Sequence, residues 1–172
     1  PSENTLGAEA GAILADIHAH AEEVGRLFPL SYASQGSARI GGALAVNSGG
    51  INVLRYGMAR DLCLGIEVVL PDGQVFHGLK RLRKDNTGYD LRHLLIGSEG
   101  TLGVITAAAL KLVPRPTNRA TAFITVQDPG AALDLLSLFQ EHAGETISAF
   151  ELMAGTSFDF LSDAFPDLRQ PF

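Results

Sequence analysis

The chain has 172 residues, with 13 basic against 19 acidic side chains, so its formal net charge is −6 at neutral pH. This acidic balance argues against a surface for nucleic acid or anionic membranes, because both need basic patches. The length suits one domain or one and a half, with enough residues for a sizeable core. The densest basic run, residues 80–84, is interpreted as a solvated face rather than a phosphate contact.

Cys63 is the single cysteine, so no intrachain disulfide can form, which fits a reducing compartment. It lies in an apolar run, which predicts an inert, buried thiol. The sequence has no recognisable signal peptide and no apolar span long enough for a membrane helix. These features predict a cytoplasmic protein. Because the chain opens at Pro1 without an initiator Met, we also expect a piece of a longer protein.

The first part of the chain predicts one helix and then glycine-rich loops. Apolar residues recur at helical spacing over residues 9–25, and Gly25 provides a C-terminal stop. Residues 29–57 mix glycine with Ser, Ala and Asn, which predicts connected loops with a short helix near residues 42–47. The histidines of the chain lack the spacing of metal ligands, so no metal site is predicted.

A β-hairpin follows. Two apolar, β-branched runs at residues 64–70 and 74–79 flank Pro71-Asp72-Gly73, in which proline presets one turn position and glycine accepts a positive φ. Beyond the hairpin we predict a short helix over residues 89–96 and a long strand over residues 104–113.

A domain boundary is predicted near residues 114–118, where Pro114 and Pro116 break the chain. It separates residues 1–115 from residues 116–172. Two regions with different folds are therefore expected.

The second region predicts a strand–helix–strand unit. Its strands are expected over residues 121–127 and 146–152. The helix between them starts with Asp128 as N-cap and Pro129 in the first turn, and it runs to about His142. This order resembles half of a ferredoxin-like domain.

Two glycine-rich segments, residues 33–50 and 97–105, are candidates for ligand binding. Neither matches the dinucleotide fingerprint or the phosphate loop of nucleotide-binding proteins. Glycine clusters can turn backbone N–H groups toward phosphate oxygens, but they can also serve only to permit tight turns. From the residues alone, both interpretations stay open.

Several motifs follow one another in a fixed order over roughly residues 5–155. They are Ile40-Gly41-Gly42, Ala45, Asn47, Gly49-Gly50, Arg55-Tyr56-Gly57, Pro71-Asp72-Gly73 and the runs at residues 84–91 and 97–106. In order and spacing they resemble the FAD-linked D-2-hydroxyacid dehydrogenases, of the D-lactate, glycolate and D-2-hydroxyglutarate type.

The resemblance implies an α+β fold. Residues 1–115 would form the second subdomain of a PCMH-type FAD-binding domain, mainly an antiparallel sheet with flanking helices, and residues 116–172 the start of a ferredoxin-like substrate domain. It implies FAD as cofactor. The residues it places at the cofactor are Ala33, Ser34, Gly36, Ser37, Arg39, Ile40, Gly41, Gly42, Ala45, Asn47, Ser48, Glu99, Gly100, Gly103, Val104 and Ile105. Val104 and Ile105 are expected to flank the flat flavin ring.

The full enzyme of this type would oxidise a small-molecule D-2-hydroxyacid by hydride transfer to the flavin. The family's upstream glycine-rich loop and its substrate-domain ligands have no match here. We therefore expect no catalytic residue in this chain and no activity of the fragment alone. A homodimer is also considered, and no nucleic-acid partner or membrane span is expected.

Single residues that suggest acid–base chemistry have simpler interpretations. Glu99 and Lys84 are interpreted as an ion pair or loop cap, and Tyr89 and Asp90 as the start and cap of a helix. Two other functions stay open. One is an FAD-fold enzyme of different chemistry, such as an alditol oxidase or alkylglycerone-phosphate synthase; the other is a non-catalytic module that binds no FAD by itself.

Overall fold

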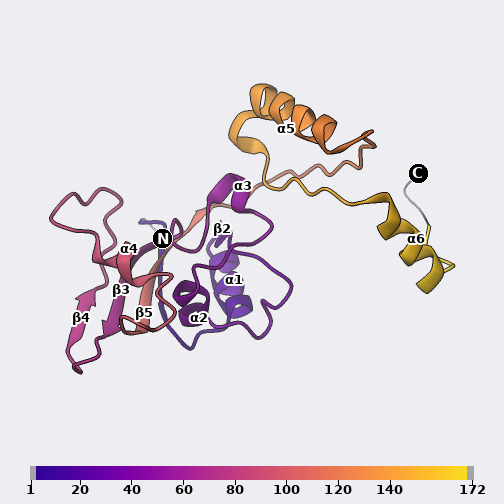
Figure 1. Cartoon of the computed structure of the whole chain (residues 1–172). Coiled ribbons are helices and arrows are strands. Elements are labelled where there is room, and N and C mark those ends of the chain that lie inside the picture. The colour runs from indigo at the N-terminus through magenta and orange to yellow at the C-terminus, as the bar shows by residue number, and fades with distance from the viewer. Residues whose placement is uncertain (1–2, 170–172) are drawn as a thin grey trace. The chain divides into compact units, whose positions relative to one another are not determined.

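The computed structural model describes residues 3–169. The chain divides into two compact units, Pro1–Thr117 and Asn118–Phe172, and the division falls inside the proline-bearing segment at residues 114–118 (Figure 1). Each unit is described by itself.

The first unit is built on a four-stranded antiparallel sheet in the order β1-β5-β3-β4. Its strands are β1 (Thr5–Glu9), β3 (Cys63–Val69), β4 (Val75–Gly78) and β5 (Val104–Lys111). The predicted hairpin is confirmed, because β3 and β4 pair around a turn in which Gly73 has a φ of +84°. Strand β1 was not predicted. It pairs with β5, which lies about a hundred residues away in sequence, so no local pattern marks it.

Helices cover one face of this sheet (Figure 1). They are α1 (Leu14–Glu23) and α2 (Ile40–Ala45), with the shorter α3 (Val53–Tyr56) and α4 (Leu91–Leu95) beside them. The helix predicted over residues 9–25 is confirmed in its centre but starts later, because its first residue ends β1. Two short strands, β2 (Arg26–Leu27) and β6 (Val113–Pro114), form a separate pair.

The core of the first unit lies between the helices and the sheet. Leu14 and Leu44 from the helices, and Ile66 and Leu110 from the strands, are fully buried. Phe28, in the connection after α1, is 1% exposed and is among the largest buried side chains. This packing holds the helices, and with them the glycine-rich segments, against a rigid sheet.

The second unit contains α5 (Pro129–Ala143), a 3-10 turn η1 (Gly144–Thr146) and α6 (Gly155–Ala164). The predicted start of α5 is confirmed: the Asp128 carboxylate accepts the N–H of Ala131 at 2.8 Å.

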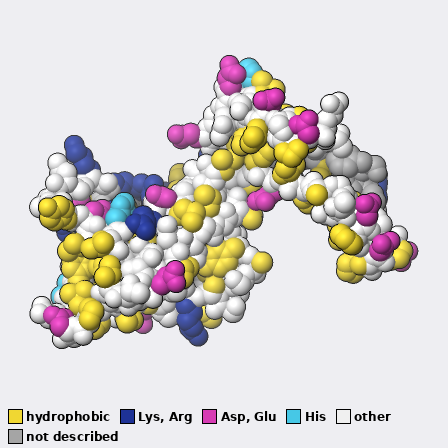
Figure 2. Space-filling view, in the orientation of Figure 1, with side chains coloured by type: hydrophobic (Ala, Val, Ile, Leu, Met, Phe, Trp, Pro, Cys, Tyr) yellow, Lys and Arg dark blue, Asp and Glu magenta, His cyan; other side chains and the backbone are white. Residues whose placement is uncertain are grey.

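The strands predicted over residues 121–127 and 146–152 are wrong: Thr146 ends η1, and the remaining residues of both segments lack regular structure. A strand needs a partner for its backbone groups, and neither segment pairs within the described residues. Apolar side chains of this unit are correspondingly uncovered (Figure 2). Leu133 is 65% exposed and Phe160 74%. In residues 3–169, no helix is both long and apolar enough to span a membrane.

Candidate cofactor-binding site

The end of α2 and the loop after α4 are joined by two backbone hydrogen bonds. The N–H of Gly97 donates to the carbonyl of Leu44 at 3.0 Å, and the N–H of Glu99 donates to the carbonyl of Ala45 at 2.9 Å. Both carbonyls lie in the last turn of α2, where no N–H four residues on continues the helix; that of Leu44 also accepts the N–H of Asn47 at 3.0 Å. The two candidate segments thus meet in one surface, which we call the paired segments. It comprises residues 41–48 and 97–104.

Arg60 links the paired segments through hydrogen bonds. Its backbone N–H donates to the Asn47 side-chain oxygen at 3.0 Å. Its guanidinium donates to the carbonyl of Ile96 at 2.8 Å and to the carbonyl of His93. Sequence reasoning missed Arg60, because an arginine in a loop carries no local sign of a partner more than thirty residues away.

Both paired segments contain a residue other than glycine in the left-handed backbone region. Asn47 has a φ of +48° and Glu99 a φ of +52°. Such conformations cost about 1–3 kcal/mol and persist where the surroundings enforce them, often at ligand sites. In residues 3–169 no ion pair joins Glu99 or Lys84 to another side chain, so the ion-pair interpretation is wrong and a backbone role is left for Glu99.

The two glycines at the start of α2, Gly41 and Gly42, have different roles. A Cβ on Gly41 would lie 2.5 Å from the Cβ of Ala10, so Gly41 is required for packing. A Cβ on Gly42 would meet no atom within 4 Å, and Gly42 has an ordinary helical φ. The described chain therefore does not need glycine at position 42, although glycine weakens a helix. A ligand lying against this backbone would need it, which is the fit expected for a flat cofactor.

The paired segments also contain exposed apolar side chains. Val46 is 56% exposed, Leu102 41% and Val104 63%. Apolar groups beside bare glycine backbone suit the face of an aromatic ligand. The Ile105 side chain cannot flank the ring as expected: it is 8% exposed and packs in the core, because the alternation of β5 turns it inward, so only its backbone can reach a ligand.

Four other predicted residues lie in or beside the paired segments. Ile40 and Gly103 are buried, so only their backbones can reach a ligand. Gly100 is exposed with a φ of +80°. The N–H of Ser48 donates to the carbonyl of Ala43 at 2.8 Å, which closes the end of α2.

The turn at residues 33–39 holds the start of α1. The carbonyl of Gln35 accepts the N–H of Ala15 at 3.1 Å, and the carbonyl of Ala38 accepts the N–H of Leu14 at 2.9 Å. Helix α1 therefore has no free N-terminus for a phosphate there. No hydrogen bond within the described chain links this turn to the loop after α4. Its predicted residues are mostly exposed: Ala33, Ser34, Gly36, Ser37 and Arg39.

Asp90 and Cys63 have the structural roles predicted for them. Asp90 is the N-cap of α4, and its carboxylate accepts the N–H of His93 at 3.1 Å. The Cys63 thiol is buried, and burial raises its pKa to about 11, so it stays protonated and inert.

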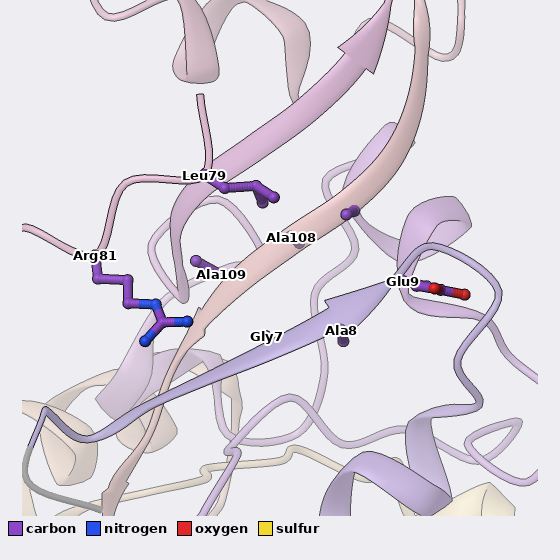
Figure 3. A pocket seen from close by; sticks show the side chains of 8 residues that line it. Gly7, Ala8, Glu9, Leu79, Arg81, Ala108 and Ala109 are labelled. Carbon is purple, nitrogen blue, oxygen red and sulfur yellow. The ribbon is translucent and has the colours of Figure 1, made fainter. Parts of the chain in front are cut away.

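A hollow of about 250 Å³ lies on the sheet over β1 and β5 (Figure 3). Its floor is formed by small residues such as Gly7 and Ala109. Arg81 extends over it from the side, and its guanidinium pairs with Glu3 at 3.4 Å. No predicted cofactor residue lines this hollow.

Residues 1–78 match the FAD binding domain family. The match indicates FAD as the cofactor, as the sequence predicts. The mitochondrial D-2-hydroxyglutarate dehydrogenase of Bos taurus is 47% identical over 148 residues, which are 86% of this chain and 27% of the relative. A D-2-hydroxyglutarate–pyruvate transhydrogenase of Saccharomyces cerevisiae is 35% identical over 171 residues, 99% of this chain and 34% of the relative.

Among solved structures, an alkyldihydroxyacetonephosphate synthase matches with a TM-score of 0.59 and 27% identity. The match covers 68% of this chain and 20% of the synthase. The chain thus spans about a third or less of the length of these proteins.

These relatives confirm the resemblance to FAD-linked D-2-hydroxyacid dehydrogenases and the antiparallel, PCMH-type fold. They correct one prediction. The cytoplasmic location is wrong, because relatives from cattle, rat, rice and Arabidopsis are named mitochondrial. A single cysteine indicates a reducing compartment but does not distinguish one such compartment from another.

Proposed function

We propose that this chain is the flavin-binding portion of an enzyme that oxidises a D-2-hydroxyacid, with D-2-hydroxyglutarate as the first candidate substrate. The observation that carries the proposal is the hydrogen-bonded pairing of residues 41–48 with residues 97–104, which brings together segments that contain the uncovered Gly42 backbone and the exposed Val104 side chain. The 47% identity to a D-2-hydroxyglutarate dehydrogenase, against 27% to a synthase, supports oxidation over the synthase alternative.

We further propose how the chain contributes. The backbone of the paired segments would hold FAD, whose flavin ring accepts the hydride when it is bound. Val46, Leu102 and Val104 would exclude water from that ring. Residues 1–115 would be the second flavin subdomain and residues 116–172 the beginning of the substrate domain, so the chemistry at the hydroxyacid would be completed by residues outside this chain.

The proposal is tested with the full-length enzyme under anaerobic conditions. Adding D-2-hydroxyglutarate should bleach the visible flavin band, whereas the L enantiomer should leave it unchanged. D-lactate and glycolate, tested in the same way, rank the substrates. A flavin that none of the D-hydroxyacids reduces would exclude the proposed reaction.

A second experiment tests the alternative of a module that binds no FAD by itself. The purified chain is mixed with FAD and passed through gel filtration. Retained flavin absorbance would mean that the paired segments already bind the cofactor; its loss would favour the module. The homodimer and the lack of a nucleic-acid partner stay predictions, the latter supported by the net charge of −6. Size-exclusion chromatography of the full-length protein tests the former.

A further inference from the structure

A hollow of about 230 Å³ in the first unit has four cationic side chains among the eight residues that line it. We call it the basic hollow. The residues that matter in it are Arg60, Asp61, Arg83, Arg92, His93 and Lys111. Four of them are cations at neutral pH and one is a carboxylate. In a chain with a net charge of −6, this local excess of positive charge runs against the overall balance.

Two of the arginines are fixed by bonds to the protein. Arg92 donates to the carbonyl of Cys63 at 2.6 Å and to the carboxylate of Asp90 at 2.7 Å. Arg60 donates to the carbonyls at the end of α4. The only carboxylate of the lining, Asp61, is also engaged, since it accepts the backbone N–H of Met58 at 2.8 Å. These groups form a fixed wall in which the charges of Arg60 and Arg92 are balanced by Asp61 and Asp90.

The other two cations have no such bonds. Within residues 3–169, neither Arg83 nor Lys111 makes a side-chain hydrogen bond or ion pair. Lys111 is partly buried at the end of β5, where its backbone N–H donates to the carbonyl of Leu62 at 2.8 Å. Arg83 comes from the loop before α4, where Lys and Arg side chains gather (Figure 2). Two uncompensated cations therefore line one small hollow, and an anion would relieve their repulsion.

We propose that the basic hollow binds the phosphate group of a small molecule. A phosphate concentrates up to two charges on one centre and offers several acceptor oxygens that an arginine and a lysine can share. A dicarboxylate spreads its charges along a chain and fits a compact hollow less well. The basic run at residues 80–84 was predicted to be a solvated face; Arg83 is exposed, yet it also borders this hollow.

The test uses the isotopically labelled full chain and inorganic phosphate, titrated at constant ionic strength against chloride. Amide resonances around Cys63, His93 and Lys111 should shift and saturate. Arg83→Gln should weaken the apparent affinity about tenfold, because it removes one charged donor from the phosphate. Arg83 is exposed and unbonded, so the variant should fold, and its unperturbed spectrum away from the hollow will show this.

Arg81→Gln is the matched control. It removes the same charge two residues away, but Arg81 pairs with Glu3 and lines the hollow over β1 and β5, so phosphate affinity should stay unchanged. Equal weakening by both variants would mean diffuse attraction and would overturn the proposal, as would shifts that never saturate. Saturable binding of glutarate without binding of phosphate would overturn the phosphate class. Displacement of phosphate by FAD would assign the hollow to the cofactor and likewise overturn it.

Discussion

The adjacent glycines Gly41 and Gly42 are predicted to respond in opposite directions to the same alanine substitution. A Cβ at Gly41 would lie 2.5 Å from the Cβ of Ala10 and 3.1 Å from its carbonyl oxygen. Ala10 cannot give way easily, because its N–H donates to the carbonyl of Thr106 at 2.8 Å and its carbonyl accepts the N–H of Gly41 at 2.9 Å. A Cβ at Gly42 would enter open space.

The expected magnitudes follow from this geometry. Gly41→Ala overpacks the contact with Ala10, the residue after β1, and should destabilise the chain by about 1–3 kcal/mol. Gly42→Ala should stabilise it by about 0.5–1 kcal/mol, because alanine is the better helix former. Thermal unfolding followed by circular dichroism should therefore show a lowered Tm for the first variant and a Tm raised by about 1–4 °C for the second.

Measuring FAD content tests whether position 42 is glycine because the cofactor lies against its backbone or without any such requirement. In the full-length enzyme, Gly42→Ala should retain less FAD although the protein is more stable, with affinity lower by about tenfold. Gly155→Ala in α6 is the control, since its Cβ would also meet nothing within 4 Å and it should not alter FAD content. Full FAD content in the Gly42→Ala enzyme would refute the assignment of this backbone to the cofactor. An unchanged Tm for Gly41→Ala would refute the packing argument.

Three further predictions concern the supports of the site. Arg60→Met should destabilise the chain by about 2–3 kcal/mol, because two carbonyls at the end of α4 lose a charged donor; an unchanged urea midpoint would contradict this. Hydrogen bonds from Thr106 and His77 hold the pKa of Glu67 below 4.5, so the stability that this carboxylate contributes is present above pH 4.5 and is lost as pH falls through the lower folded-state pKa. In urea unfolding at a series of pH values, the Glu67→Gln variant should therefore lose less stability on acidification than the unchanged chain. An equal loss in both proteins would contradict this prediction. Since burial raises the pKa of the Cys63 thiol to about 11, iodoacetamide should label it slowly at neutral pH in the folded chain and completely in urea, whereas fast labelling of the folded chain would disprove its burial.

Local patterns predicted the elements whose causes are local. The hairpin was predictable because Pro71-Asp72-Gly73 presets its turn, and α5 because Asp128 caps it. Strand β1 was not, because its residues become a strand only through pairing with β5. The strands expected over residues 121–127 and 146–152 failed for the same reason, since apolar, β-branched composition does not supply a neighbouring strand.

The candidate site divides in the same way. The glycine-rich segments and their order were visible in the sequence, and they were enough to identify the family and FAD. The sequence could not distinguish Gly41, which packing requires, from Gly42, whose Cβ would point into open space. It also could not show that Ile105 faces the core while Val104 faces outward.

By itself, the sequence determined the helical and hairpin segments, the acidic charge and the relatedness to hydroxyacid dehydrogenases, because each depends on the identity and order of nearby residues. Only the tertiary structure decided that residues 41–48 and 97–104 form one surface, that Arg60 fastens it, and that Arg83 and Lys111 line a common hollow. These are contacts between residues distant in sequence. They exist because packing against one sheet brings separate loops together, and no local propensity encodes that arrangement.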